Sequence, residues 1–463
     1  MNKTFRTQGE PDPKFHRVCE KAAALMEEYK VPGVAAGVWH DQRQQAVGLG
    51  VTSLGNPLET LPDTLFQIGS ITKTFTATLV MGLKDEGKLE LDVPIRRYLP
   101  EFKLASEEAA VRVTLRHLLT HLGGFEGDFY SSFGAGDDAL ARYVDRMAEL
   151  PQNMPLGKLW SYSNAGFNLA GRCIEIATGV SYERAVKRRI FQPLGMASSY
   201  FFPDDFMTRR FACGHTVAPD GAVQVARPWK LPRTMNAAGG IVSSVPDLLS
   251  YARFHLGDGS APDGTRLLKT ESVREMQTRQ ARAFHLADTM GLGWFLGEEA
   301  GARTALHGGS TIGQKATLLF LPEHDTALAV LTNATSGDTL YRELTSFILE
   351  EYLGLKTPAP EFVEPPRTLL EEYAGRYTAV LDDAELILVE DGLRLQLLPK
   401  IGADAPWPPM GVGFVNDRCF QIMDLPLKGQ SGEFIRDEDG AVGWLHLGGR
   451  LHPRWDAGGP TGS

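Results

Sequence analysis

Runs of β-like sequence lie near both ends of the first 353 residues, with mainly helical sequence between them. They occupy residues 34–39, 44–50, 316–322 and 326–333. From residue 70 to about residue 200 the apolar spacing is chiefly helical, and helix-forming sequence also stands at 14–30 and 339–353. We therefore predict an α/β fold, in which an antiparallel sheet is flanked by helices and interrupted by a helical subdomain.

A proline-rich segment at residues 357–366 divides the 463-residue chain. Such a segment favours extended backbone and is typical of a linker, and the chain is longer than one ordinary core allows. Beyond it, alternating apolar residues flank turns at Gly392 and Gly440. Many short strands must close or stack to bury a face, which predicts a small antiparallel β-barrel. We expect a first domain at 1–354, a linker at 355–366 and the barrel domain at 367–463.

The charge balance argues against some classes of partner. With 47 basic and 57 acidic residues the net charge is −10, which gives no general attraction to nucleic acid or to anionic membrane. The four cysteines show no disulfide or C-x-x-C spacing and the eleven histidines show no zinc-ligand spacing, so nothing indicates a metal or a cofactor. The first residues contain no apolar signal segment, which predicts a cytoplasmic protein. The sequence leaves self-association open.

Ser70 stands three residues before Lys73, where a loop turns into a helix. Residues three apart share one helix face, so the lysine amine comes beside the serine hydroxyl. A serine nucleophile needs a base within hydrogen-bond reach, and a helix N-terminus favours both an oxyanion and a neutral amine. The helix carries an apolar stripe of Ile71, Phe75, Leu79 and Leu83, and Gly87 stands where it should stop. The spacing is short enough to arise by chance, so other motifs must decide.

Tyr162 and Asn164 follow a glycine-containing loop and precede an expected helix that ends at Gly179. A tyrosine hydroxyl near a lysine can accept a proton from an attacking serine or return one to the leaving group. Asn164 can donate and accept at once, so it can orient Lys73 and a substrate carbonyl. The alternative interpretation is a buried tyrosine that only satisfies its own hydroxyl.

A third element, His307-Gly-Gly-Ser310, stands just before the β-like run at residue 316. Its glycines, Gly309 among them, are expected to let a substrate backbone approach a strand edge closely. The same His-x-Gly spacing occurs at His121, His255 and His446, for which we expect no catalytic role. The stretch at residues 235–240 stays open between a pocket lining and a tight turn.

In this order, Ser70-x-x-Lys73, Tyr162-x-Asn164 and His307-x-Gly309 resemble the motifs of the penicillin-recognising serine hydrolases. This group contains class C β-lactamases, D-aminopeptidases, DD-carboxypeptidases and related carboxylesterases. Flanking phrases at 118–124, 160–167, 193–196 and 331–333 also look like this family. The tail, with Tyr373-Ala-Gly-Arg-Tyr377, looks like the lipocalin-like barrel that some of these hydrolases carry. A G-x-S-x-G elbow is missing from the chain, which disfavours an α/β-hydrolase.

The resemblance implies a β-lactamase/transpeptidase-like fold in which Ser70 is acylated and Lys73 and Tyr162 share the acid and base work. The implied substrate-binding residues are Asn164, His307, Gly309 and Ser310. The backbone N–H groups of Ser70 and Ser310 form the implied oxyanion hole.

One departure from the family concerns the substrate. His307 stands where many β-lactamases have lysine, and a largely neutral imidazole attracts a substrate carboxylate less strongly. We therefore expect small esters, amides or peptides as substrates. A penicillin-binding or β-lactam-hydrolysing protein is one alternative, and a non-catalytic ligand sensor or assembly protein is another.

Overall fold

The computed structural model describes residues 5–9, 12–218, 220–356, 358–400, 407–424 and 427–455. The chain forms two compact units. The first contains residues up to Leu159, Ser163–Ala281 and Thr289–Thr357, and the second contains Trp160–Tyr162, Arg282–Asp288 and the residues from Pro358 onward. Parts of the expected N-terminus, linker and barrel lie outside the described residues, namely 1–4, 10–11, 357, 401–406, 425–426 and 456–463.

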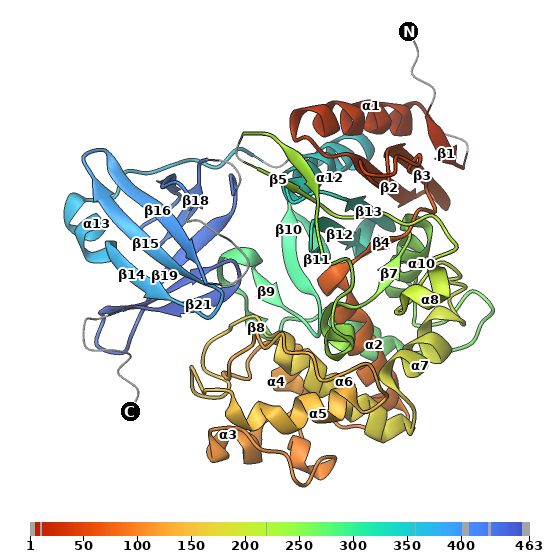
Figure 1. Cartoon of the computed structure of the whole chain (residues 1–463), viewed down its shortest axis with the longest axis horizontal. Helices are drawn as coiled ribbons and strands as arrows, with labels where there is room; N and C mark the ends of the chain where they lie inside the picture. Colours follow the sequence, from red (N-terminus) through yellow and green to blue (C-terminus); the bar gives the residue numbers. More distant parts are fainter. Residues whose placement is uncertain are drawn as a thin grey trace. The chain divides into compact units, whose positions relative to one another are not determined.

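A nine-stranded sheet forms the centre of the first unit (Figure 1). Its order is β1-β3-β2-β13-β12-β11-β10-β9-β8, so strands from both ends of the unit's sequence become neighbours. Trp39 of β2 lies opposite Ala327 of β13 in an antiparallel pair, which confirms the predicted antiparallel sheet. The strands are β1 (Arg6–Gln8), β2 (Gly33–His40), β3 (Arg43–Gly50), β8 (Ala281–Arg282), β9 (Thr289–Met290), β10 (Phe295–Glu299), β11 (Ala302–Thr311), β12 (Gln314–Leu321) and β13 (Thr326–Thr332).

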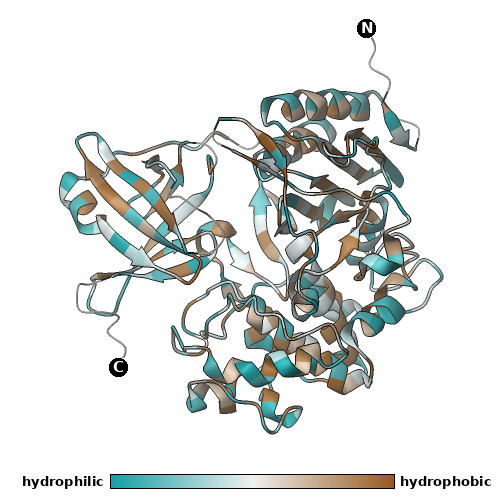
Figure 2. Ribbon diagram, viewed as in Figure 1, coloured by the Kyte–Doolittle hydropathy of each residue, from teal (hydrophilic) through white to brown (hydrophobic). Residues whose placement is uncertain are grey.

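Both faces of this sheet are covered by helices. Because successive side chains along a strand point to opposite sides, neighbouring residues of one strand belong to different cores. Val34 of β2 belongs to the core that α1 (Pro13–Glu28) and α12 (Gly337–Leu353) cover. Its neighbour Ala35 belongs to the opposite core, together with α10 (Val245–Leu256). Figure 2 shows apolar residues along the central strands. Burial on two faces explains why these runs are apolar throughout instead of alternating with polar residues.

A helical subdomain is built around α2 (Thr72–Asp85), which is buried along most of its length. The predicted stripe of Ile71, Phe75, Leu79 and Leu83 is buried, and Gly87 follows the helix end with a φ of 71°. Further helices are α3 (Glu107–Arg112), α4 (Leu115–Leu119), α5 (Ala139–Arg146), α6 (Asn164–Thr178), α7 (Tyr182–Val186), α8 (Pro203–Phe206), α9 (Asn236–Gly239) and α11 (Thr270–Met276). Short helical turns are η1 (Gly69–Ile71), η2 (Ile95–Arg97), η3 (Met147–Glu149), η4 (Lys187–Phe191), η5 (Arg233–Met235) and η7 (Pro322–His324). Two-stranded ribbons pair β4 (Phe66–Gln67) with β7 (Val242–Ser243) and β5 (His215–Val217) with β6 (Val223–Val225).

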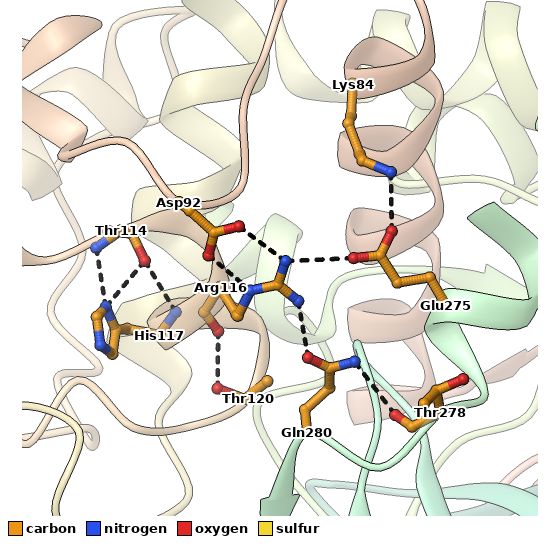
Figure 3. Close-up of polar contacts among 9 residues, drawn as sticks. All are labelled: Lys84, Asp92, Thr114, Arg116, His117, Thr120, Glu275, Thr278 and Gln280. Atoms are coloured by element: carbon orange, nitrogen blue, oxygen red, sulfur yellow. Dashed lines mark hydrogen bonds and ion pairs between the residues drawn. The ribbon is translucent and has the colours of Figure 1, made fainter. Parts of the chain in front are cut away.

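A polar network connects α2, α4 and α11 (Figure 3). Arg116 of α4 donates two hydrogen bonds to the Asp92 carboxylate, at 2.6 and 2.9 Å, and further bonds to Glu275 and Gln280. Lys84, near the end of α2, donates to Glu275 at 2.8 Å. Bidentate contacts between arginine and carboxylate fix geometry as well as charge. The network therefore anchors the end of the helix whose first turn carries Lys73.

The strands of the second unit follow one another in sequence order from β14 to β21. They are β14 (Gly375–Thr378), β15 (Asp382–Val389), β16 (Gly392–Pro399), β17 (Met410–Phe414), β18 (Cys419–Ile422), β19 (Ser431–Arg436), β20 (Val442–Leu447) and β21 (Arg450–Pro453). A bridge between Tyr377 and Arg454 brings the outer strands together, so the sheet is nearly closed. Phe420 and Phe434 fill its interior beside α13 (Arg367–Tyr373). This confirms the expected small antiparallel barrel.

Two short segments from earlier in the sequence belong to the second unit. Arg282 forms an ion pair with Glu433, and η6 (Phe284–Leu286) places His285 Nδ1 3.1 Å from His446 Nδ1. The segment Trp160–Tyr162 is the other one.

Within the described ranges, every helix is too short or too polar to cross a bilayer.

Candidate active site

Ser70 lies in η1, directly before α2, and Lys73 lies in the first turn of α2. The Lys73 amine donates a hydrogen bond to Ser70 Oγ over 3.1 Å. Lys73 is fully buried, whereas Ser70 is half-buried. The loop-to-helix junction predicted from the sequence therefore brings the amine and the hydroxyl together.

Two carbonyl oxygens fix the direction of the Lys73 amine. It donates to Asn164 Oδ1 and to the backbone oxygen of Ala238, each at 2.7 Å. When a neutral amine gives two N–H groups to these oxygens, its lone pair remains to accept the Ser70 hydroxyl proton. Ala238 belongs to the stretch 235–240, so this stretch contributes a backbone acceptor to the site and is more than a tight turn.

Asn164 is in turn oriented by two residues that the sequence motifs did not indicate. Its Nδ2 donates to Asp128 Oδ1 and to the Tyr130 hydroxyl, each at 2.9 Å, and that hydroxyl donates to Asp128 at 2.9 Å. A carboxylate accepts hydrogen bonds only, so Asp128 draws the amide NH2 toward itself and leaves the amide oxygen for Lys73. Asp128 and Tyr130 stand in a loop with no recognisable spacing, which is why sequence reasoning missed them.

The backbone around Asn164 is held at the start of α6. Ser163 caps the helix by accepting the Gly166 N–H at 3.0 Å, as expected for serine at an N-cap. The Ser163 N–H donates to His121 Nδ1 at 3.0 Å, so His121 supports this turn from the buried side. Tyr162 comes immediately before Ser163 but packs with the second unit, where its side chain is buried.

Glycines allow η1 and β11 to approach closely. A Cβ atom added to Gly309 would lie 1.9 Å from the Ile68 carbonyl oxygen, and one added to Gly69 would lie 2.7 Å from the Ser310 nitrogen. The sequence predicts that a substrate backbone approaches Gly309 closely. In the structure, the turn that carries Ser70 approaches this glycine. This approach brings the backbone of Ser310 beside the Ser70 turn, as the implied oxyanion hole requires.

His307 lies on β11 with its side chain buried. Burial, aided by the positive charge of Lys73, lowers the pKa of His307 to about 3. Its Nδ1 lies 2.6 Å from the Gly308 carbonyl oxygen, which fits an Nδ1–H donor on a neutral ring. The neutrality expected from an ordinary imidazole is therefore strengthened by the environment.

The other histidines with His-x-Gly spacing are buried side chains that pack in the interior of their units. His255 is buried among aromatic rings and its Nε2 lies 3.1 Å from Thr78 Oγ1, and His446 is buried in the second unit. In the part of the chain that the structure describes, groups of three or more His, Cys, Asp or Glu side chains with metal-binding geometry are absent.

A protein-family model described as Beta-lactamase matches residues 20–353, which is more than half of the chain. The chain belongs to the beta-lactamase family. This membership confirms the family resemblance drawn from Ser70, Tyr162 and His307 and their neighbours. It also agrees with the fold, in which an antiparallel sheet and a helical subdomain contribute to one site.

Relatives within and around the beta-lactamase family differ in their named activities. Penicillin-binding protein 4 from Amycolatopsis lactamdurans is 36% identical over 352 residues, which are 75% of this chain and 92% of that protein. Esterase EstB from Burkholderia gladioli is 29% identical over 62% of this chain and 81% of that protein. A crystal structure of SurE aligns with a TM-score of 0.76 at 27% identity over 96% of this chain and 99% of that one, and a crystal structure of SurE with D-Leu aligns with a TM-score of 0.75.

Proposed function

We propose that this protein is a serine hydrolase that forms a Ser70 acyl-enzyme with small esters, amides or peptides. The observation that carries the proposal is the contact of the buried Lys73 amine with Ser70 Oγ, while two carbonyl oxygens accept the two N–H groups of the neutral amine. An amine in this position can take the hydroxyl proton as the oxygen attacks a carbonyl carbon. Asn164 fixes Lys73 and faces the substrate.

The motif order supports a second acid/base group. In the proposed cycle Tyr162 passes a proton to the leaving group and later helps water attack the acyl carbon. The backbone N–H groups of Ser70 and Ser310 stabilise the oxygen that becomes negative in each tetrahedral intermediate. One such donor contributes about 3 to 4 kcal/mol to the transition state.

The substrate class follows from charge and from the relatives. The neutral, buried His307 supplies no positive charge for the carboxylate that penicillins carry. Membership of a family with an esterase relative supports ester or amide substrates. The D-Leu bound in a SurE structure supports including acyl groups with a D-configured residue.

The test is to mix the full chain with a fluorophosphonate and find the modified residue by mass spectrometry. We expect a single adduct on Ser70, and no adduct on Ser70→Ala at equal thermal stability. Steady-state rates are then measured with p-nitrophenyl esters, D- and L-aminoacyl anilides and a chromogenic cephalosporin. Full hydrolysis by Ser70→Ala, or no adduct on the unaltered protein, contradicts the proposal.

A second function is supported by the 36% identity to a penicillin-binding protein. In that case Ser70 forms an adduct with penicillin that persists, and ester turnover stays at background. A transient adduct that is released as product instead supports hydrolysis. Intact-mass spectra taken over minutes to hours after penicillin addition separate the two outcomes.

A further inference from the structure

We propose that the turn between β20 and β21 positions Tyr162, with Gly449 and Arg450 as positioning residues for the proposed acid/base group. This inference rests on the proposed role of Tyr162. It adds a task for the second unit, which the family motifs do not assign.

Each part of the Trp160–Tyr162 segment meets this strand pair. The backbone N–H of Tyr162 donates to the Gly449 carbonyl oxygen at 2.8 Å. The ring of Trp160 packs against His446 of β20, with 5.3 Å between centroids. The Arg450 guanidinium carbon lies 4.9 Å from the centroid of the Tyr162 ring. One contact thus fixes the tyrosine backbone and another fixes its ring.

The turn has a shape that only glycine provides. Gly449 has a φ of 83°, and a Cβ added to it would lie 2.9 Å from Leu286 Cδ1 and 3.4 Å from Tyr162 Cβ. Arg450 donates from Nη1 to the Gly448 carbonyl oxygen at 2.9 Å, so the turn also holds its own arginine. The glycine therefore sets the distance between the turn and Tyr162.

The charge of Arg450 suits a tyrosine that moves protons. A cation over an aromatic face is attracted by the ring, and a nearby positive charge favours a deprotonated phenol oxygen. A leucine or methionine could fill the same space but would supply no charge. We infer that Arg450 both orients the ring and assists the proton transfer.

Gly449→Ala tests the positioning by the backbone. We expect kcat for a nitrophenyl ester to fall roughly 10- to 100-fold with KM within about twofold, because a misplaced acid/base group loses much of its contribution. The matched control is Gly440→Ala in the β19–β20 turn. Gly440 has a similar φ of 86° with open space around its Cβ position, so this variant carries the strain without the contact. Equal rates in both variants overturn the proposal.

Arg450→Met and Arg450→Lys test the charge if Gly449→Ala folds poorly. We expect Arg450→Met to lower kcat about tenfold and to move the alkaline limb of the kcat/KM profile to higher pH, because the phenol that donates the proton then has a higher pKa, whereas Arg450→Lys keeps the limb in place. A purely structural role lowers the rate without moving the limb, and that result contradicts the proposal. Fluorophosphonate labelling of Ser70 in the unaltered protein reports separately on the proposed function.

Discussion

At the scale of single residues, the site depends on a short chain of oriented groups. Asp128 accepts from the Asn164 amide, the Asn164 oxygen accepts from Lys73, and Lys73 reaches Ser70. Each link fixes the next, because a carboxylate and an amide oxygen can only accept, which directs the N–H groups of Asn164 and then of Lys73. A substitution at Asp128 should therefore change the orientation of the Lys73 amine toward Ser70, three hydrogen bonds away.

Asp128→Asn should lower kcat/KM about tenfold. An amide at this position can turn its own NH2 toward Asn164, which permits the Asn164 amide to flip and present NH2 to Lys73. The measurement is ester hydrolysis, with circular dichroism to check the fold. The control is Glu126→Gln in the same loop, where the carboxylate bonds the Asp128 N–H and the Asn153 side chain. A normal rate in Asp128→Asn contradicts the orienting role.

The sequence predicts the contact of Lys73 with Ser70 in this chain of groups but not the contact of Asp128 with Asn164. Ser70 and Lys73 share a fixed spacing along one helix, so their proximity follows from helix geometry. Asp128 lies 36 positions from Asn164 in irregular structure, and no spacing rule connects the two. The stretch around Ala238 was equally ambiguous, because a backbone carbonyl acts without any characteristic side chain.

At the scale of elements, the packing of η1 against β11 leaves no room for a side chain at Gly309. Gly309→Ala places a methyl group on the Ile68 carbonyl oxygen and should push the Ser70 turn away from Ser310. We expect a loss of about 100-fold in kcat, the size of one lost oxyanion donor. Gly308→Ala is the matched control, because its nearest neighbour to a new Cβ is the Tyr341 hydroxyl at 3.5 Å. If both variants keep normal rates, the tight approach is not needed.

Elements with a strong period could be predicted and short ones could not. The strands β2, β3, β12 and β13 and the helices α1, α2 and α12 follow from apolar runs or stripes in the sequence. The strands β8 and β9, at one end of the sheet, have two residues each, so they have no period to detect. At Gly309 the glycine pattern predicts a close approach, but it does not identify the Ile68 carbonyl as the approaching group.

At the scale of the whole molecule, buried histidines should make both units sensitive to acid. Burial lowers the pKa of His255 and His307 in the first unit to about 3, and that of His285 in the second unit to about 3. In the unfolded chain a histidine has a pKa near 6.5 and binds a proton below that pH. In the folded protein the same side chain binds a proton only near pH 3. Stability is therefore full above pH 6.5 and falls as the pH drops toward 3.

We expect urea unfolding midpoints to fall clearly between pH 7.5 and pH 5. Each fully buried histidine should lower the free energy of unfolding by about 2 kcal/mol at pH 5 relative to pH 7.5. His255→Phe should reduce this pH dependence. Equal midpoints at the two pH values contradict the prediction.

The pairing of β2 with β13 also has a consequence for biosynthesis. Trp39 meets Ala327, which the ribosome adds 288 positions later. At about 5 to 20 residues per second, the nascent chain carries β2 for roughly 15 to 60 s before its second neighbour exists. During that time one edge of an apolar strand has no native partner and invites pairing with other chains. A molecular chaperone that shields the β2–β3 hairpin on the ribosome should raise the yield of this protein more than one that acts after release.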